Sequence, residues 1–239
     1  MNVIISPLGD SAIRIEFGKK IEDGIHQKIK MLAKQVEDHP FVGFIECVLG
    51  YTSLTIFYNC FTVWCTYKKD REDSPFEIVK SLIEDRLQVC EGEDSTNLRT
   101  IDIPVCYGGE FGPDLEEVAK YHDMTTSEVI DIHTSGQYLV YMIGFCPGFP
   151  FLGGMSDRIA MPRRNTPRLS IPKGSVGIAG MQTGVYPIST PGGWQLIGRT
   201  PLQLFLPGEN PPSLLQAGDR VKFHAISLEE YNAYGEGDI

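Results

Sequence analysis

Basic side chains gather in one part of this 239-residue sequence. Residues 132–208 hold six basic residues against a single acid, a net charge of +5 within a chain whose formal charge is −10. A guanidinium group binds a carboxylate or phosphate through paired hydrogen bonds, and a local positive charge attracts small anions. The segment predicts an anion site whose substrate- or phosphate-binding residues include Arg163, Arg164, Arg168 and Lys173. The alternative is a set of arginines that are exposed on a barrel surface or paired with acids of another domain.

Glycines recur at a regular spacing inside this basic segment. Gly174, Gly177 and Gly180 stand three residues apart, and backbone amides without a side chain can approach a phosphate closely. The sequence contains no nucleotide-binding loop of the Gly-Lys-Ser/Thr type. Gly177 and Gly180 are therefore candidates for phosphate binding, and a strand with close backbone packing is the alternative.

Side chains that can carry or orient a proton lie along the same segment. The candidates for a catalytic role are His133, Tyr141, Gln182 and Tyr186. His133 closes an apolar helical pattern, so a buried core histidine is an equal alternative to a catalytic one. No paired-carboxylate, Ser-His-Asp or Cys-His signature accompanies these residues.

A loop rich in aromatic residues precedes the arginines. Phe145, Phe149 and Phe151 alternate with Pro147 and several glycines, a composition that excludes a helix. Such a cluster either fills the mouth of a barrel or forms an exposed patch, and core filling is the commoner outcome. As a patch, these four residues and Trp194 would bind a partner.

The elements that must position these groups begin with an α/β unit. Apolar residues alternate over residues 13–17, which predicts a strand, and recur at helical spacing from 21 to 36. Strands are expected at 42–49 and 52–58, and Ser74-Pro75 with Glu77 starts a second helix. The uncharged run 47–67 predicts a buried strand plus a loop rather than a membrane span. The acidic, polar residues 91–97 are the expected linker, so we predict a βαββα-type N-terminal domain at 1–95.

The pattern of expected elements changes beyond residue 95. A strand is expected at 98–105, followed by short helices at 114–122 and 125–133, the second with a Thr125/Glu128 capping box. Residues 136–208 are short apolar strands broken by turns, which is typical of a small β-barrel. The prediction is an α+β protein with its barrel domain at 96–239.

Composition excludes several classes of function. An isoelectric point near 5.0 and a net charge of −10 argue against nucleic-acid binding, which needs clustered Lys and Arg. The first ten residues lack the basic flank and apolar core of a secretory signal, so a cytoplasmic location is expected. The six cysteines form no CxxC pair, which favours reduced thiols and predicts no metal site.

Three long motifs carry a family resemblance. Residues 141–154 (YMIGFCPGFPFLGG), 174–187 (GSVGIAGMQTGVYP) and 191–201 (PGGWQLIGRTP) closely resemble the bacterial family of the 5-oxoprolinase B subunit, also called KipI. Residues 8–12 and 51–54 resemble its N-terminal motifs. That family is related to allophanate hydrolase subunit 1 and to half of the urea carboxylase carboxyltransferase domain.

The resemblance implies a fold, an activity and partners. It implies an N-terminal α/β domain, a cyclophilin-like β-barrel, and one component of a complex that opens 5-oxo-L-proline to L-glutamate with ATP hydrolysis. The A and C components of that complex, the second a homologous barrel protein, would be the partners, and ATP, with magnesium, the co-substrate. Gln182 and Thr183 could orient the lactam. The alternatives are inhibition of a sensor histidine kinase and a role as half of a carboxyltransferase.

Overall fold

The computed structural model describes residues 3–70, 73–89 and 99–236. The chain divides into two compact units, Met1–Asn97 and Leu98–Ile239. The expected linker at 91–97 and the expected domain boundary at 95/96 lie outside the described residues. The α+β class and the barrel predicted from the sequence are confirmed. No helix among these residues has the length and apolar character needed to cross a bilayer.

The N-terminal unit is an antiparallel sheet with helices. Its elements are β1 (Ile4–Pro7), β2 (Ala12–Glu16), α1 (Asp23–Asp38), β3 (Phe44–Leu49), β4 (Ser53–Tyr58), α2 (Cys60–Tyr67) and α3 (Pro75–Val89). The strand order is β1-β2-β4-β3, and every neighbouring pair is antiparallel. The unit therefore contains one strand and one helix more than the βαββα prediction.

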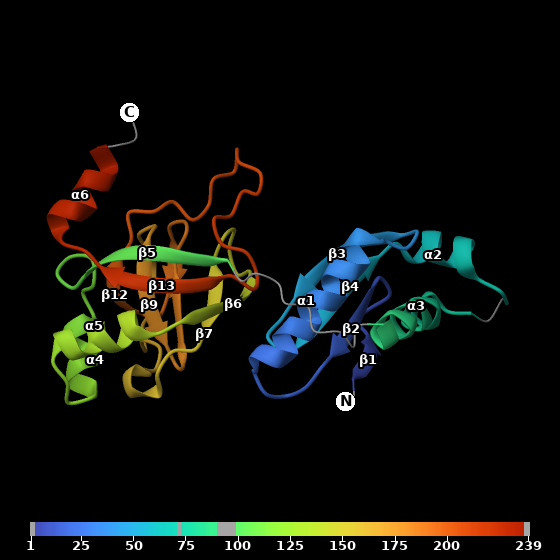
Figure 1. The fold of residues 1–239 in the computed structure, drawn as a ribbon, viewed down its shortest axis with the longest axis horizontal. Helices are drawn as coiled ribbons and strands as arrows, with labels where there is room; N and C mark the ends of the chain where they lie inside the picture. The colour runs from blue at the N-terminus through green and yellow to red at the C-terminus, as the bar shows by residue number, and fades with distance from the viewer. Residues whose placement is uncertain (1–2, 71–72, 90–98, 237–239) are drawn as a thin grey trace. The chain divides into compact units, whose positions relative to one another are not determined.

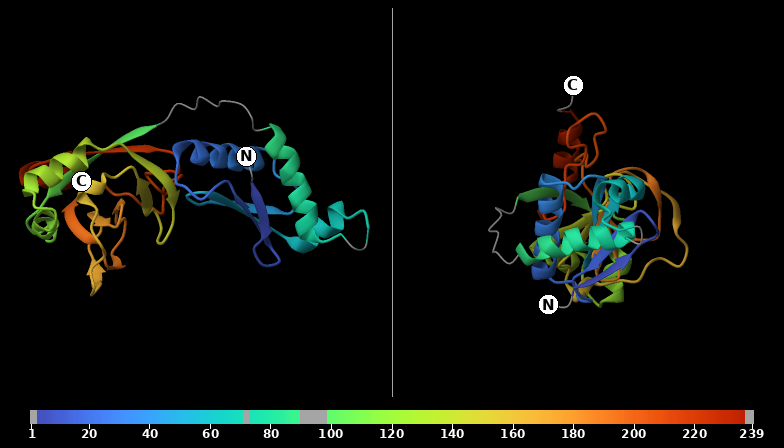
Figure 2. Two further views of the ribbon diagram at one scale, coloured as in Figure 1. Left: turned by 90° about the horizontal axis from the view of Figure 1, so that it is seen from below. Right: turned by 90° about the vertical axis from the view of Figure 1, so that its right-hand side faces the viewer.

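One face of this sheet is buried by α1 and α3. Ile13 pairs with Ile56 and Ile15 with Leu54, so these four side chains share a face, and all are inaccessible to solvent. They form one core with apolar residues of the two helices, which lie on the same side of the sheet (Figure 2). The apolar residues that alternate along the strands and those that recur at helical spacing pack together in this core, because each element presents one apolar face.

The α2 helix corrects the expectation of a loop after the uncharged strand. Asn59 precedes the helix, and its side-chain Oδ1 accepts a hydrogen bond from the Thr62 backbone N–H at 2.9 Å. This bond satisfies one of the free amides at the helix start. The short strand β1 is also absent from the prediction, since its four residues carry no clear alternation.

The second unit is built on a closed barrel (Figure 1). Its strands are β5 (Thr100–Tyr107), β6 (Tyr138–Ile143), β7 (Pro150–Gly153), β9 (Ser175–Ala179), β10 (Gln182–Val185), β12 (Gln195–Arg199) and β13 (Arg220–Ala225), in the order β10-β7-β6-β13-β5-β12-β9. The strands β9 and β10 pair with each other and close the ring. All neighbouring pairs are antiparallel except β5 with β13.

Helices and a small sheet accompany the barrel. They are α4 (Leu115–Tyr121), α5 (Thr126–Ser135), the 3-10 turn η1 (Asp157–Ile159), the strand pair β8 (Arg168–Ile171) and β11 (Thr190–Gly192), and α6 (Leu228–Glu236). The predicted capping box is confirmed at α5, where the Thr125 hydroxyl and the Glu128 side chain bond each other's backbone amides.

Alternate residues of β9 face two different apolar clusters. Val176 and Ile178 belong to the main core inside the barrel, whereas Ala179 belongs to a second cluster with Phe149 and Trp194. Side chains on a strand alternate between its two faces, so the second cluster lies on the outer surface of the barrel wall. Of the predicted site residues, Phe149, Tyr186 and Trp194 belong to this second cluster, and Phe151 packs against it.

Candidate functional site

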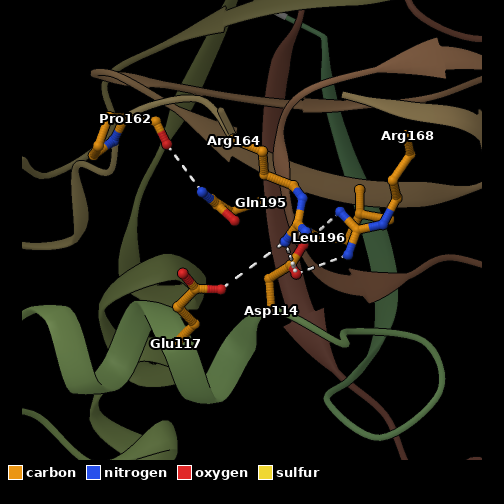
Figure 3. Close-up of polar contacts among 7 residues, drawn as sticks. All are labelled: Asp114, Glu117, Pro162, Arg164, Arg168, Gln195 and Leu196. Atoms are coloured by element: carbon orange, nitrogen blue, oxygen red, sulfur yellow. Dashed lines mark hydrogen bonds and ion pairs between the residues drawn. The ribbon is translucent and has the colours of Figure 1, made fainter. Parts of the chain in front are cut away.

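The Asp114 carboxylate connects three distant parts of the barrel unit (Figure 3). Its Oδ1 accepts hydrogen bonds from Arg164 Nη1 at 2.8 Å and Arg168 Nη2 at 2.7 Å. Its Oδ2 accepts from Arg168 Nη1 at 2.8 Å and from the Leu196 backbone N–H at 2.7 Å. Glu117 lies farther out, with Oε2 3.9 Å from Arg164 Nη1. One buried carboxylate is therefore shared by two guanidinium groups and a strand amide.

Asp114 is 3% exposed, and a buried carboxylate persists only where hydrogen bonds and opposite charge replace water. This residue was missed by sequence reasoning, which placed it at the start of a predicted helix. In the structure it precedes α4, but its side chain makes no capping hydrogen bond. No sequence pattern indicates its contacts, because the arginines lie 50 and 54 residues away.

The arginine prediction is corrected in part by this arrangement. Arg164 and Arg168 use Nη donors to bind Asp114, so these donors are not free for a ligand. Arg163 is exposed, and among the described residues its side chain makes no ion pair or hydrogen bond. Lys173 is also exposed, in the turn between β8 and β9.

The backbone on both sides of Arg163 is held in place. The Pro162 carbonyl accepts a hydrogen bond from Gln195 Nε2 at 3.0 Å, and the Arg164 N–H donates to the Gly193 carbonyl at 2.7 Å. Gln195 is itself 3% exposed. Arg163 thus stands between two residues whose backbones are anchored by hydrogen bonds.

Tyr186 lies close to the basic residues. Burial raises the pKa of Tyr186 to about 12, and the nearby Arg163 and Arg168 guanidinium groups oppose part of that rise. The side chain is 2% exposed and packs in the second cluster against Phe149 and Trp194. At neutral pH its hydroxyl is protonated, so it can donate a hydrogen bond but does not act as a base.

His133 is sealed inside the barrel unit. Its Nδ1 lies 2.7 Å from the Tyr107 hydroxyl, and its Nε2 lies 2.9 Å from the Thr183 hydroxyl. Thr183 donates its proton to the Gly177 carbonyl, so the ring carries its own proton on Nε2 and accepts from Tyr107 at Nδ1. Burial lowers the pKa of His133 to about 3. A neutral, fully enclosed ring of this kind holds the fold and has no route to a substrate.

Two other candidates for a catalytic role, Tyr141 and Gln182, lie on strands that β7 separates in the barrel. Tyr141, on β6, is 4% exposed, and its ring lies over Gly153, where an added Cβ would come within 2.2 Å. Gln182 begins β10 and is half-buried.

Gly177 and Gly180 have structural roles that differ from each other. A Cβ at Gly177 would lie 3.2 Å from the Trp194 Cβ, so the missing side chain makes room for the indole. Gly180 has φ +57° in the β9–β10 turn, and its N–H donates to the Met161 carbonyl at 2.7 Å. These observations correct the phosphate-binding prediction for Gly177 and Gly180.

The aromatic loop is divided between core and surface. Phe149 and Trp194 are buried, with ring centroids 5.6 Å apart in an edge-to-face arrangement, and Phe151 is half-buried beside them. The partner-binding prediction is therefore corrected for Phe149 and Trp194. Phe145, 65% exposed, and Pro147 remain on the surface.

Comparison with known proteins supports the resemblance. The family model for the carboxyltransferase domain, subdomain C and D, matches residues 3–215. The chain belongs to this family. It is 59% identical to the 5-oxoprolinase B subunit of Bacillus subtilis, over 97% of this chain and 96% of that protein. It is 40% identical to the 5-oxoprolinase B subunit of Haemophilus influenzae, over 96% of this chain and 100% of that protein.

A solved structure shares the fold at much lower identity. The urea carboxylase of Kluyveromyces lactis matches with a TM-score of 0.74 and 21% identity, over 97% of this chain and 22% of that chain. A likeness at this identity concerns the fold and not the reaction.

For this member of the family, the geometry separates two roles among the basic residues. Arg164 and Arg168 are structural cations that neutralise Asp114. Arg163 and Lys173, by contrast, are exposed and make no ion pair in the part of the chain that the structure describes. The arrangement can therefore bind an anion and neutralise developing negative charge.

Proposed function

We propose that this chain is the B subunit of a 5-oxoprolinase, a hydrolase that opens 5-oxo-L-proline to L-glutamate with ATP hydrolysis. The observation that carries the proposal is the 59% identity, over nearly the full length of both chains, to a protein of that name. Activity is proposed to require the A and C components as partners, and to take place in the cytoplasm, where ATP is abundant and thiols stay reduced.

The substrate is a lactam, a stable amide whose ring opening requires activation. One route transfers the terminal phosphoryl group of ATP to the lactam oxygen and releases ADP. Water then adds to the carbon and the ring C–N bond breaks, and a second water releases phosphate from the resulting acyl phosphate to give glutamate. Such a reaction depends on positioning and on neutralisation of charge. Arg163 and Lys173 are exposed cations suited to the substrate carboxylate or a phosphate, and the protonated Tyr186 is suited to donate a hydrogen bond.

The remaining parts of the site are proposed to come from the partner proteins. Among the described residues, no group of three or more His, Cys, Asp or Glu side chains could hold a metal ion. Magnesium that accompanies ATP is proposed to be held by the phosphates and by residues of the partner proteins. Phe145 and Pro147, which are exposed on the loop beside the second cluster, are proposed to contact a partner.

The test is reconstitution of the complex. The chain is mixed with the A and C components, and ATP hydrolysis is measured with and without 5-oxoproline. The proposal expects turnover that depends on the substrate and disappears when this chain is omitted. Equal turnover without the chain would contradict it.

The two alternatives have weaker support. The likeness to urea carboxylase shows the fold alone at 21% identity, and a carboxyltransferase half would predict a biotin-carrier partner. Kinase inhibition would need a surface for a helical bundle, yet Phe149 and Trp194, two of the five residues expected to form it, are buried. An autophosphorylation assay with saturating chain separates the inhibitor from the enzyme component.

A further inference from the structure

The segment 162–168 is fixed at four points around a side chain that has no partner among the described residues. Backbone hydrogen bonds hold Pro162 and Arg164, and Asp114 binds the guanidinium groups of Arg164 and Arg168. Between these points stands Arg163, exposed and without an ion pair or hydrogen bond in the described part of the chain. Side chains that bind ligands well are held by neighbours that do not touch the ligand.

The charge balance at this point depends on Asp114. Arg164 and Arg168 bring two positive charges to one oxygen, Oδ1, and the Asp114 carboxylate is the close acid that compensates them, since Glu117 is 3.9 Å away and 62% exposed. Removing the negative charge would leave two guanidinium groups facing each other and a third cation, Arg163, next in sequence. Like charges at this range repel strongly in a partly buried setting, so the segment would open.

We propose that Asp114 is a positioning residue, which binds Arg164 and Arg168 and thereby holds Arg163 where it binds the carboxylate of 5-oxoproline. The proposal rests on the proposed function for the identity of the ligand. The anchoring of the segment does not depend on it.

The anchoring is tested on the full chain by limited digestion with trypsin. Asp114→Asn keeps the size of the side chain but turns an NH₂ group toward donors, because an amide cannot accept at both ends. Cleavage after residues 163, 164 or 168, identified by mass, should be at least about fivefold faster than in the wild type, as a local opening would cause. The matched control is Glu116→Gln, an exposed residue of α4, which should leave the rate unchanged.

The action through Arg163 is tested in the reconstituted complex. Asp114→Asn and Arg163→Gln should each raise the KM for 5-oxoproline about tenfold, the scale of one hydrogen bond to a charged group. The value of kcat should change less than KM. The KM of the double variant should be no higher than that of Arg163→Gln alone, because Asp114 acts only through the segment that carries Arg163.

Several outcomes would overturn the proposal. An unchanged KM in Asp114→Asn would show that Asp114 does not act through Arg163. A rise in the KM of the double variant equal to the product of the two single rises would show the same. Unchanged trypsin cleavage would refute the anchoring. If Asp114→Asn does not fold, Arg168→Lys keeps the charge and removes the two-pronged bond, and about a threefold rise in KM is expected. A wild-type complex without activity on 5-oxoproline would refute the proposed function and the ligand with it, while the trypsin rates would still decide the anchoring.

Discussion

Asp114 and His133 are both buried ionisable residues of the barrel unit, yet their surroundings favour opposite charge states. Asp114 accepts four hydrogen bonds, three of them from guanidinium groups. His133 is enclosed by the hydroxyls of Tyr107 and Thr183, with no charge among these partners, and its pKa is lowered to about 3. The first residue is surrounded by charged donors, and the second is held as a neutral ring.

The difference between these two surroundings shows how a buried side chain of this barrel unit can remain charged. A charge survives burial when an opposite charge replaces the lost water, and otherwise the group becomes neutral. The charged network reaches the surface through Arg164 and Glu117, next to Arg163. The neutral network ends at the Gly177 carbonyl inside the wall. Of the two networks, the charged one is therefore the one that extends to the surface, where a ligand can bind.

The largest expected effect comes from removal of the buried carboxylate. Asp114→Ala leaves two guanidinium groups and the Leu196 amide without an acceptor, and should lower the free energy of unfolding by about 3–5 kcal/mol. Urea unfolding of the full chain, followed by circular dichroism, measures it. A loss below about 1 kcal/mol would mean that the arginines find other partners and that the charged network is not a unit.

The neutral network around His133 should change how the free energy of unfolding depends on pH. The pKa of His133 is near 3 in the folded chain against an ordinary value of 6.5, so the unfolded state takes up the proton first as the pH falls. Stability should therefore decrease below pH 6.5 by about 1.4 kcal/mol per pH unit from this residue, or about 2 kcal/mol between pH 6 and 4.5. His133→Gln should show a correspondingly flatter profile. Parallel profiles for the two proteins would contradict the neutral, enclosed ring.

A smaller loss is expected when the acceptor of the histidine proton is removed. Thr183→Val keeps the shape of the side chain but leaves the His133 Nε2–H unpaired, which should cost about 1–2 kcal/mol. The measurement is thermal or urea unfolding at pH 7. A neutral result would indicate that the ring is not held in the Nε2-protonated form.

The smallest effect is expected at the exposed edge of the charged network. Glu117 lies 3.9 Å from Arg164 and is 62% exposed, and such surface pairs contribute little. Glu117→Ala should change the free energy of unfolding by no more than about 0.5 kcal/mol. A loss of stability comparable to that of Asp114→Ala would mean that the different burial of Asp114 and Glu117 does not determine how much each contributes to the free energy of unfolding.

Elements with a repeating apolar pattern were predictable from the sequence. The apolar positions that recur between 21 and 36 form α1, although Ile21 itself lies before the helix, and the capping box marks the start of α5. The helix α2 was not predictable, because its eight residues lack a charged face and resemble the continuation of an apolar strand. A single capping bond from Asn59 is too weak a signal to distinguish the two.

The site was predictable in composition but not in geometry. The arginines stood out because they are concentrated in one acid-poor segment. Their partner Asp114 did not, since contacts over 50 residues depend on how the chain closes the barrel. For the same reason His133 and Gly177 looked available for chemistry, whereas their neighbours in space, Thr183 and Trp194, enclose them.

The most direct test of the proposed function is the formation of glutamate. Labelled 5-oxoproline, ATP and magnesium are incubated with the complete set of components, and with sets that lack one component each. The account predicts labelled glutamate from the complete set and none when this chain is left out. Glutamate formed at the same rate without this chain would contradict its assignment as a component of the enzyme.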